Sequence, residues 1–116
     1  MIKRNPKKRK SLNKKGKESV WWVYMIRAYD NSIYTGISTD VARRFEEHSS
    51  VNPKGARYLK GKGPLQLLLK KKIGNKSEAS KVEWQIKQLS KDKKEALVAG
   101  KTNWRTFLQS LNLTQT

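Results

Sequence analysis

Five residues of this chain have types and spacings that could support phosphate chemistry. Tyr24 and Tyr34 lie ten residues apart, Arg44 and His48 lie four apart, and Glu83 falls in a long helical pattern. Phenol, imidazole and carboxylate groups can hold or move protons, whereas a guanidinium stays charged and can grip two phosphate oxygens. Hydrolysis of a phosphodiester needs a positioned water, a proton acceptor and positive charge on the developing phosphate. The set contains a candidate for each requirement.

A β-hairpin is predicted to carry the two tyrosines. The apolar runs 21–26 and 33–37 are rich in Trp, Val, Tyr and Ile, which favour strands. Asp30-Asn31 lies between them, and Asp and Asn tolerate the backbone conformations of turns. The hairpin therefore presents both phenols beside the element that follows it.

A helix is predicted directly after the hairpin. Val41 and Phe45 fall four residues apart on one face. Ser38 or Thr39 is expected to cap this helix, and Asp40 suits the positive end of its dipole. The same periodicity places the arginine and the histidine together on a neighbouring face.

Two further elements complete the expected fold. The apolar run 65–69 predicts a third strand that leaves the core near Ile73 and pairs with the hairpin, giving a three-stranded antiparallel sheet. The span 77–90 is the strongest helical pattern, with Ser77 as its expected N-cap. Glu83 borders the buried stripe of this helix, where its carboxylate could look across the sheet. The stripe comprises Ala79, Val82, Ile86 and Leu89.

The chain is expected to divide into three parts. Residues 1–18 are dense in lysine and arginine, so we expect a disordered basic arm that contacts phosphates or serves only as a solubilising tail. Residues 19–99 form one small α+β domain, in which helices flank the sheet. Residues 100–116 are a tail that could form a helix and dock on the domain or on a protein partner. Its apolar residues have helical spacing: Trp104, Phe107, Leu108 and Leu111.

The net charge of +18, from 27 basic and 9 acidic residues, favours an anionic partner such as nucleic acid. A membrane surface is disfavoured because we find no basic helix with a broad apolar face. With no cysteine and one histidine, a zinc site or a disulfide is not expected, and any metal would be held by oxygen. No apolar stretch reaches the ~18 residues of a membrane helix. We expect a soluble cytoplasmic protein, associated with the nucleoid if the source is prokaryotic.

The span 49–64 is predicted to be a basic loop because glycine and proline interrupt it repeatedly. Cations combined with an aromatic ring can hold a phosphate backbone and stack a base. The alternative is a charged connector whose Tyr58 packs on the core. The nucleic-acid-binding candidates are Lys54, Arg57, Tyr58, Lys60 and Lys62, together with Arg43 from the preceding helix.

The motifs of the hairpin and first helix resemble those of a known family. Trp22-Val23-Tyr24, Tyr34-Thr35-Gly36, Arg43-Arg44 and His48 together look like the GIY-YIG nuclease domain. More narrowly, the chain resembles its small stand-alone (UPF0213-like) branch, which is similar to structure-selective junction nucleases and the excision-repair incision subunit. The likeness covers roughly 21–98. The first motif has Trp-Val in place of Gly-Ile and the second has a threonine where an aliphatic residue is usual, but both tyrosines are kept.

This resemblance implies a divalent-metal-dependent DNA endonuclease and a role for each candidate. Glu83 would hold one hydrated Mg²⁺ or Mn²⁺, and Arg44 would bind the scissile phosphate. Tyr24 and Tyr34 would activate or position the attacking water. A phenol with a pKa of ~10 needs cationic neighbours to lower that pKa before it can act as a base at neutral pH. His48 would be a base or proton shuttle, or would only support the hydrogen-bond network.

A second hypothesis from another class is a basic module that binds DNA or RNA without catalysis. Its tyrosines would stack on bases and Glu83 would be structural. The combination of both tyrosines with Arg44 and Glu83 favours the enzyme, since an acid beside phosphate repels the ligand unless a cation intervenes. A structure-selective role in DNA repair or recombination is compatible with the enzyme, while the preferred DNA structure is left open.

Overall fold

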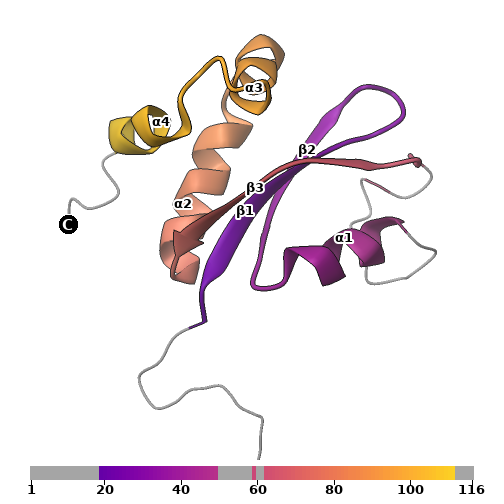
Figure 1. Ribbon diagram of the computed structural model, residues 1–116, viewed down its shortest axis with the longest axis horizontal. Helices are drawn as coiled ribbons and strands as arrows, with labels where there is room; N and C mark the ends of the chain where they lie inside the picture. The colour runs from indigo at the N-terminus through magenta and orange to yellow at the C-terminus, as the bar shows by residue number, and fades with distance from the viewer. Residues whose placement is uncertain (1–18, 50–58, 60–61, 112–116) are drawn as a thin grey trace, which may run out of the picture.

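The computed structural model describes residues 19–49, 59 and 62–111, so the expected basic arm and most of the basic loop lie outside the described residues. Within these residues the chain forms an α+β fold of three strands and four helices (Figure 1). The expected fold class is therefore confirmed. The elements are β1 (Trp21–Arg27), β2 (Ile33–Ser38), α1 (Val41–Ser49), β3 (Gln66–Gly74), α2 (Lys76–Lys87), α3 (Lys91–Val98) and α4 (Trp104–Ser110).

The sheet is antiparallel with the strand order β2-β1-β3, so β1 is the central strand. The predicted hairpin of β1 and β2 is confirmed. In its turn the Asp30 carboxylate accepts hydrogen bonds from the Ser32 backbone N–H at 3.1 Å and the Ser32 hydroxyl at 2.6 Å. Asn31 adopts a positive φ of 70°, a left-handed conformation that asparagine tolerates well.

The third strand is longer than its apolar run suggested. β3 continues through Lys70–Lys72 and pairs with β1 as far as Gly74, opposite Trp21. Lysine is common on edge strands because its charge stays in water while its stem lies along the sheet. Gly74 ends β3, and Asn75 directly after it is the N-cap of α2.

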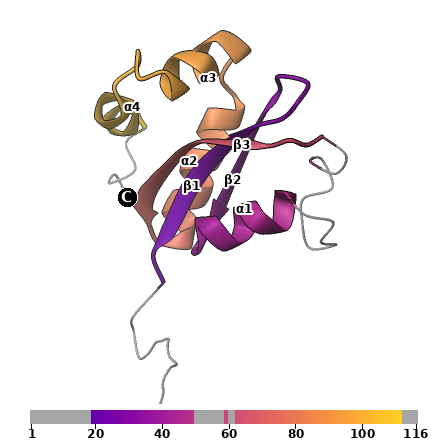
Figure 2. The same cartoon turned by 45° about the vertical axis from the view of Figure 1, so that its right-hand side comes forward.

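The two faces of the sheet are covered by different helices (Figures 1 and 2). Side chains alternate between faces along β1, as they must in any strand. Val23 and Met25 join an apolar cluster with Val82 of α2, on what we call the α2 face. Tyr24 packs with Val41 of α1, on what we call the α1 face.

The cap of α1 differs from the expected one. Asp40 Oδ1 accepts a hydrogen bond from the Arg43 backbone N–H at 3.1 Å, which is the geometry of an N-cap. Ser38 is the last residue of β2, and its hydroxyl accepts from the Asp40 backbone N–H at 2.9 Å. Ser38 therefore shapes the turn before the helix, and the prediction of Ser38 or Thr39 as the cap was wrong.

The cap of α2 also lies elsewhere than predicted. Asn75, not Ser77, is the N-cap: its side chain accepts from the Glu78 backbone N–H at 2.8 Å, and Glu78 Oε1 accepts from the Asn75 backbone N–H at 3.0 Å. This reciprocal capping box satisfies two N–H groups at once, which a lone serine two residues later could not do. Ser90 caps α3.

The C-terminal tail forms a helix and docks on the domain. The apolar side chains around α4 pack against the α2-face cluster: Trp104, Phe107, Leu108 and Leu111. Docking of the tail on a protein partner stays a prediction. None of the helices within 19–49 and 62–111 has the length and apolar character that crossing a membrane requires.

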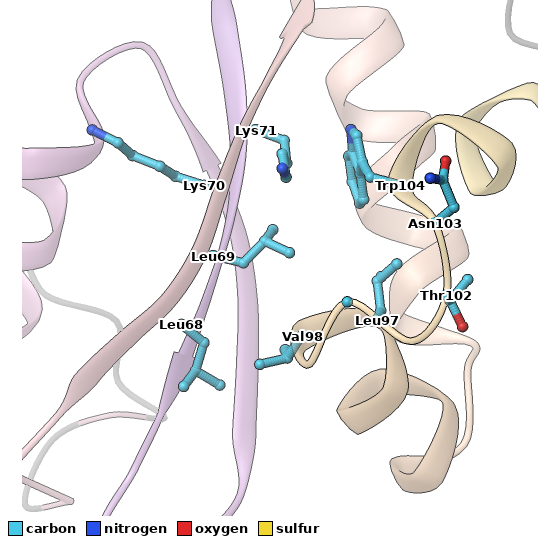
Figure 3. Close-up of a pocket in the computed structure, with 10 residues that line it drawn as sticks. Leu68, Leu69, Lys70, Lys71, Leu97, Val98, Thr102, Asn103 and Trp104 are labelled. Carbon is cyan, nitrogen blue, oxygen red and sulfur yellow. The ribbon is translucent and has the colours of Figure 1, made fainter.

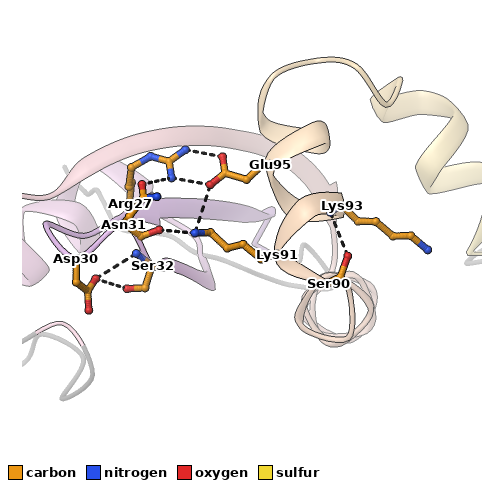
Figure 4. Close-up of polar contacts among 8 residues, drawn as sticks. All are labelled: Arg27, Asp30, Asn31, Ser32, Ser90, Lys91, Lys93 and Glu95. Carbon is orange, nitrogen blue, oxygen red and sulfur yellow. Dashed lines mark hydrogen bonds and ion pairs between the residues drawn. The ribbon is translucent and has the colours of Figure 1, made fainter.

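A polar clamp ties α3 to the hairpin (Figure 4). The Arg27 guanidinium donates two hydrogen bonds of 2.7 Å to the Glu95 carboxylate and a third of 2.9 Å to Asn31 Oδ1. Lys91 Nζ donates to the Asn31 carbonyl at 2.8 Å. The first of these contacts is a bidentate pair, which fixes geometry better than a single ion pair.

Candidate active site

Two phenols and an imidazole meet on the α1 face of the sheet. The Tyr24 hydroxyl lies 2.9 Å from His48 Nε2, and both side chains are buried. The Tyr34 ring centroid lies 5.4 Å from that of His48 and 6.3 Å from that of Tyr24. Strands β1 and β2 and helix α1 thus bring together three of the residues that the sequence analysis singled out.

Gly36 makes room for this cluster. It lies opposite Tyr24 in the β1–β2 register. A Cβ atom at Gly36 would lie 2.5 Å from the Tyr24 hydroxyl oxygen, a distance that real Cβ atoms essentially never show, and 3.1 Å from Tyr34 Cε2, which is an unusually tight contact. The glycine of the second motif is therefore required here by the close approach of the phenols.

Arg44 lies beside the Tyr24 hydroxyl and hydrogen-bonds to it. Its guanidinium also donates to Glu47 Oε1 at 2.8 Å. Arg43, one position round the helix, points outward, with 59% of its side chain exposed, and pairs with Asp40 at 3.6 Å and Glu47 at 3.2 Å. The two arginines therefore differ in environment, and Arg44 is the one that faces the phenols.

Glu47 is a member of this site that sequence reasoning missed. Its side chain is only 11% exposed, and its two carboxylate oxygens hold one arginine each. The signal that could have found it is its spacing of three and four residues from Arg44 and Arg43, which places all three on one helical surface. An acid in that position orients Arg44 and offsets part of its charge.

The electrostatics of the cluster differ from the expectation for Tyr24. Burial raises the pKa of Tyr24 above its ordinary value, and the neighbouring Tyr34 raises it further, while Arg44 lowers it by less. A role for Tyr24 as a base requires cationic neighbours to lower its pKa, and Arg44 alone does not meet that condition, because the desolvation of a phenolate outweighs one nearby cation. Tyr24 is a neutral phenol at neutral pH.

His48 is also neutral at neutral pH. Burial, helped by the positive charge of Arg44, lowers its pKa to about 4. Because a guanidinium can only donate, the Tyr24 oxygen accepts from Arg44 and keeps its own hydrogen to donate. A neutral imidazole beside that hydroxyl can accept a proton, so the arrangement suits proton transfer through His48 better than ionisation of Tyr24.

Glu83 comes from a different element of the fold. It lies on α2, which covers the other face of the sheet, and its Oε2 atom forms an ion pair with Lys87 Nζ at 3.2 Å. Its side chain is 23% exposed, so the carboxylate is reachable by water without facing bulk solvent. The predicted site residues thus divide into four on the α1 face and one on the helix behind the sheet.

The acidic and histidine side chains of the described residues could hold a metal ion only at a site with few protein ligands. Across 19–49, 59 and 62–111, the structure contains no group of three or more acidic or histidine side chains able to share an ion. A single accessible carboxylate suits Mg²⁺, which keeps much of its water shell and often takes one or two carboxylates. The chemistry of Glu83 fits that requirement.

The predicted basic loop is described only at Leu59 and from Lys62 onward. Lys54, Arg57, Tyr58 and Lys60 lie outside the described residues. Lys62 Nζ pairs with Asp30 Oδ2 at 3.1 Å and so ties the end of the loop to the hairpin turn. Hydrogen bonds from Ser32, with Lys62 as the next contributor, lower the pKa of Asp30 to about 2. The observed contact of Lys62 is structural.

Comparison with known proteins places this geometry in a family. Residues 20–96 match the model of the GIY-YIG catalytic domain. The chain is 48% identical over 91 residues to a UPF0213 protein of Enterobacter sp. (strain 638), which covers 78% of this chain and 87% of that protein. It is 46% identical over the same length to the UPF0213 protein YhbQ of Salmonella typhimurium, with coverages of 78% and 89%.

One solved structure is also similar. The solution NMR structure of the UPF0213 protein BH0048 from Bacillus halodurans is 41% identical, covers 74% of this chain and 89% of its own, and superposes with a TM-score of 0.46. The matched family model spans both tyrosine motifs, α1 and α2, and hence every candidate catalytic residue. The chain belongs to the GIY-YIG catalytic domain family, within which its relatives are UPF0213 proteins.

Proposed function

We propose that this protein is a divalent-metal-dependent endonuclease that hydrolyses phosphodiester bonds in DNA with one metal ion. The observation that carries the proposal is the buried contact of 2.9 Å between the Tyr24 hydroxyl and His48 Nε2, with Arg44 beside them. Burying a phenol and a neutral imidazole beside a partly exposed guanidinium is costly. Their assembly on one face is typical of a site that binds an anion and moves a proton.

Each residue of the α1 face has a chemical task in this proposal. Arg44 holds the scissile phosphate and offsets the charge that develops on its oxygens. Tyr24 and Tyr34 orient the attacking water through their hydroxyl groups. His48, neutral at working pH, accepts the proton that this network releases.

Glu83 would hold the metal ion, which when bound would supply Lewis-acid stabilisation of the leaving oxygen. Lys87 forms an ion pair with Glu83, and this ion pair would have to open or rearrange when a metal ion binds the carboxylate. The net charge of the chain favours DNA as the partner, and a role in repair or recombination is part of the proposal.

One observation favours the alternative, a nucleic-acid-binding module without catalysis. Glu83 sits on the helix that covers the opposite face from the tyrosines, and its carboxylate is engaged by Lys87. If that ion pair is the whole role of Glu83, the α1 face would bind phosphate through Arg44 without cleaving it.

The deciding experiment is a panel of end-labelled DNA substrates incubated with Mg²⁺, Mn²⁺ or EDTA. The panel includes single strand, duplex, nick, flap and four-way junction, with a matched RNA strand. We expect cleavage in either metal, none in EDTA, and a loss of about 10²-fold or more in Glu83→Gln with DNA binding retained. Glu46→Gln is the matched control, because Glu46 is an exposed acid of α1.

Equal cleavage by Glu83→Gln and wild type would remove the metal role of Glu83. Binding without cleavage of every substrate in either metal would support the non-catalytic module.

A further inference from the structure

The α1 face of the sheet extends beyond the cluster of tyrosines to the edge strand. In the strand register Gly36, Tyr24 and Lys70 form one row across β2, β1 and β3. The next row contains Trp22 and Lys72. Directly paired residues of antiparallel strands point to the same face. The row that contains the catalytic phenol therefore ends in a lysine, and a second lysine follows it.

Lys70 and Lys72 differ from the lysine between them. Figure 3 shows that Lys70 and Lys71 leave β3 in opposite directions, Lys71 toward Trp104 on the α2 face. Lys71 Nζ lies 6.0 Å from the Trp104 ring centroid. The Lys71 side chain also lines a pocket, together with residues of α3 and of the segment before α4. Because side chains alternate along β3, Lys70 and Lys72 lie on the α1 face with the candidate active site, and Lys71 lies on the α2 face.

The charges of this pair are available to a ligand. Both lysines are exposed, and in the part of the chain that the structure describes no carboxylate pairs with either of them. Lys70 Nζ lies over the Trp22 ring at 5.6 Å from its centroid. This cation–π contact holds the ammonium group over the sheet while leaving its N–H groups able to donate.

We propose that Lys70 and Lys72, with Trp22 positioning Lys70, bind the backbone phosphates of the DNA strand next to the scissile phosphate. The proposal rests on the proposed function, because it takes the scissile phosphate to lie at Arg44 and the phenols. Two like charges on one face, with no carboxylate partner among the described residues, call for an anionic ligand, and neighbouring strands are only about 4.8 Å apart. The lysines thus extend the phosphate-binding surface from the cluster to the sheet edge.

The experiment measures DNA binding in EDTA, so that cleavage plays no part in the readout. A fluorescein-labelled strand is titrated with wild type and with Lys70→Gln/Lys72→Gln at a series of salt concentrations, and the affinity follows from anisotropy. We expect about tenfold weaker binding at low salt. We also expect a slope of log affinity against log salt that is shallower by roughly 1.4 to 1.8, because two phosphate contacts are lost.

The matched control is Lys71→Gln/Lys81→Gln, which removes the same charge from the other side of the sheet. Lys71 faces Trp104, and Lys81 is exposed on α2. This control should keep the wild-type slope. The variant Lys70→Arg/Lys72→Arg should keep both affinity and slope, since it keeps the charge. Circular dichroism of each variant verifies that the fold is retained.

Two results would overturn this assignment. Equal losses in both glutamine pairs would mean that affinity follows total charge, and an unchanged slope in Lys70→Gln/Lys72→Gln would mean that neither lysine contacts phosphate. Either result leaves the endonuclease proposal intact, because cleavage in Mg²⁺ tests that separately. Conversely, a wild type that cleaves nothing can still show the expected difference in slope.

Discussion

The two faces of the sheet are built from alternate residues of the same strand and serve different ends. On the α2 face, Val23 and Met25 of β1 pack with Val82 and Ile86 in a cluster without a buried charge. On the α1 face, Tyr24 is buried against an imidazole and beside a guanidinium. The period of two lets one strand supply an apolar cluster to one side and residues of the candidate active site to the other. This alternation also explains how a chain of 116 residues accommodates an apolar cluster and a candidate active site on one sheet.

The difference is also electrostatic. The α1 face buries groups whose protonation is perturbed, Tyr24 upward and His48 downward in pKa. Burial that shifts these two pKa values stabilises neither side chain. Shifted pKa values of this kind concentrate at functional sites. On the α2 face, the buried Oγ1 atom of Thr35 has no hydrogen-bond partner among the described residues.

The largest expected effect comes from changing one residue on each face. Arg44→Ala should lower kcat/KM for DNA cleavage about 10²- to 10³-fold, because it removes charge stabilisation of the transition state. Its free energy of unfolding should change by about 1 kcal/mol or less, as the side chain is partly exposed. Ile86→Ala should do the reverse, costing about 2–5 kcal/mol in urea unfolding while the folded enzyme cleaves normally.

The control for the first change is Arg43→Ala. Arg43 carries the same charge on the same helix but is mostly exposed and faces Asp40 and Glu47. Its loss should alter the cleavage rate by about threefold at most. If Arg43→Ala were as damaging as Arg44→Ala, the contacts of Arg44 with Tyr24 would not be the reason for its effect, and the two arginines would act only as charge.

The pH dependence of stability tests the burial of His48. Its pKa is about 4 in the fold against 6.5 as the ordinary value, so between these values the unfolded chain binds a proton that the folded chain does not. Stability should therefore rise with pH across that window by roughly 3 kcal/mol at most, and be level above it. Urea unfolding monitored by circular dichroism at successive pH values measures the change.

The variant His48→Gln should flatten this dependence between about pH 4.5 and 6.5. The carboxyl groups of Asp30 and Glu95 have pKa values lowered to about 2, by Ser32 and Arg27 respectively, so their loss of stability comes at lower pH. A variant with the wild-type slope in this window would show that another group titrates there.

Much of this contrast between faces could be predicted from local sequence patterns. The strand-favouring residues of the runs 21–26 and 33–37 predicted the hairpin, and the period near 3.6 of Ala79, Val82 and Ile86 predicted α2. These signals depend on residues close in sequence. The co-location of Tyr24 with His48 followed from joining the two predictions.

Other features depend on how distant segments pack, and local patterns do not determine them. The face on which α2 docks decides where Glu83 lies, and that docking is set by contacts with Val23 and Met25 across the sheet. The raised pKa of Tyr24 has burial as its main cause, and Leu59 from beyond α1 joins the cluster around the phenol. The burial that shifts the pKa of Tyr24 thus comes from distant segments, and the residues next to Tyr24 in sequence do not indicate it.

The smallest expected effect concerns Thr35, which lies opposite Met25 and so on the α2 face. Its side chain is 2% exposed, and among described residues its Oγ1 atom has no hydrogen-bond partner. Thr35→Val keeps the shape and removes the unsatisfied hydroxyl, so it should raise the free energy of unfolding by about 1 kcal/mol in urea titration. Thr35→Ser, which keeps the hydroxyl and loses the methyl group, should lower it. A less stable valine variant would mean that ordered water satisfies Oγ1, and the α2 face would then be less purely apolar than its packing indicates.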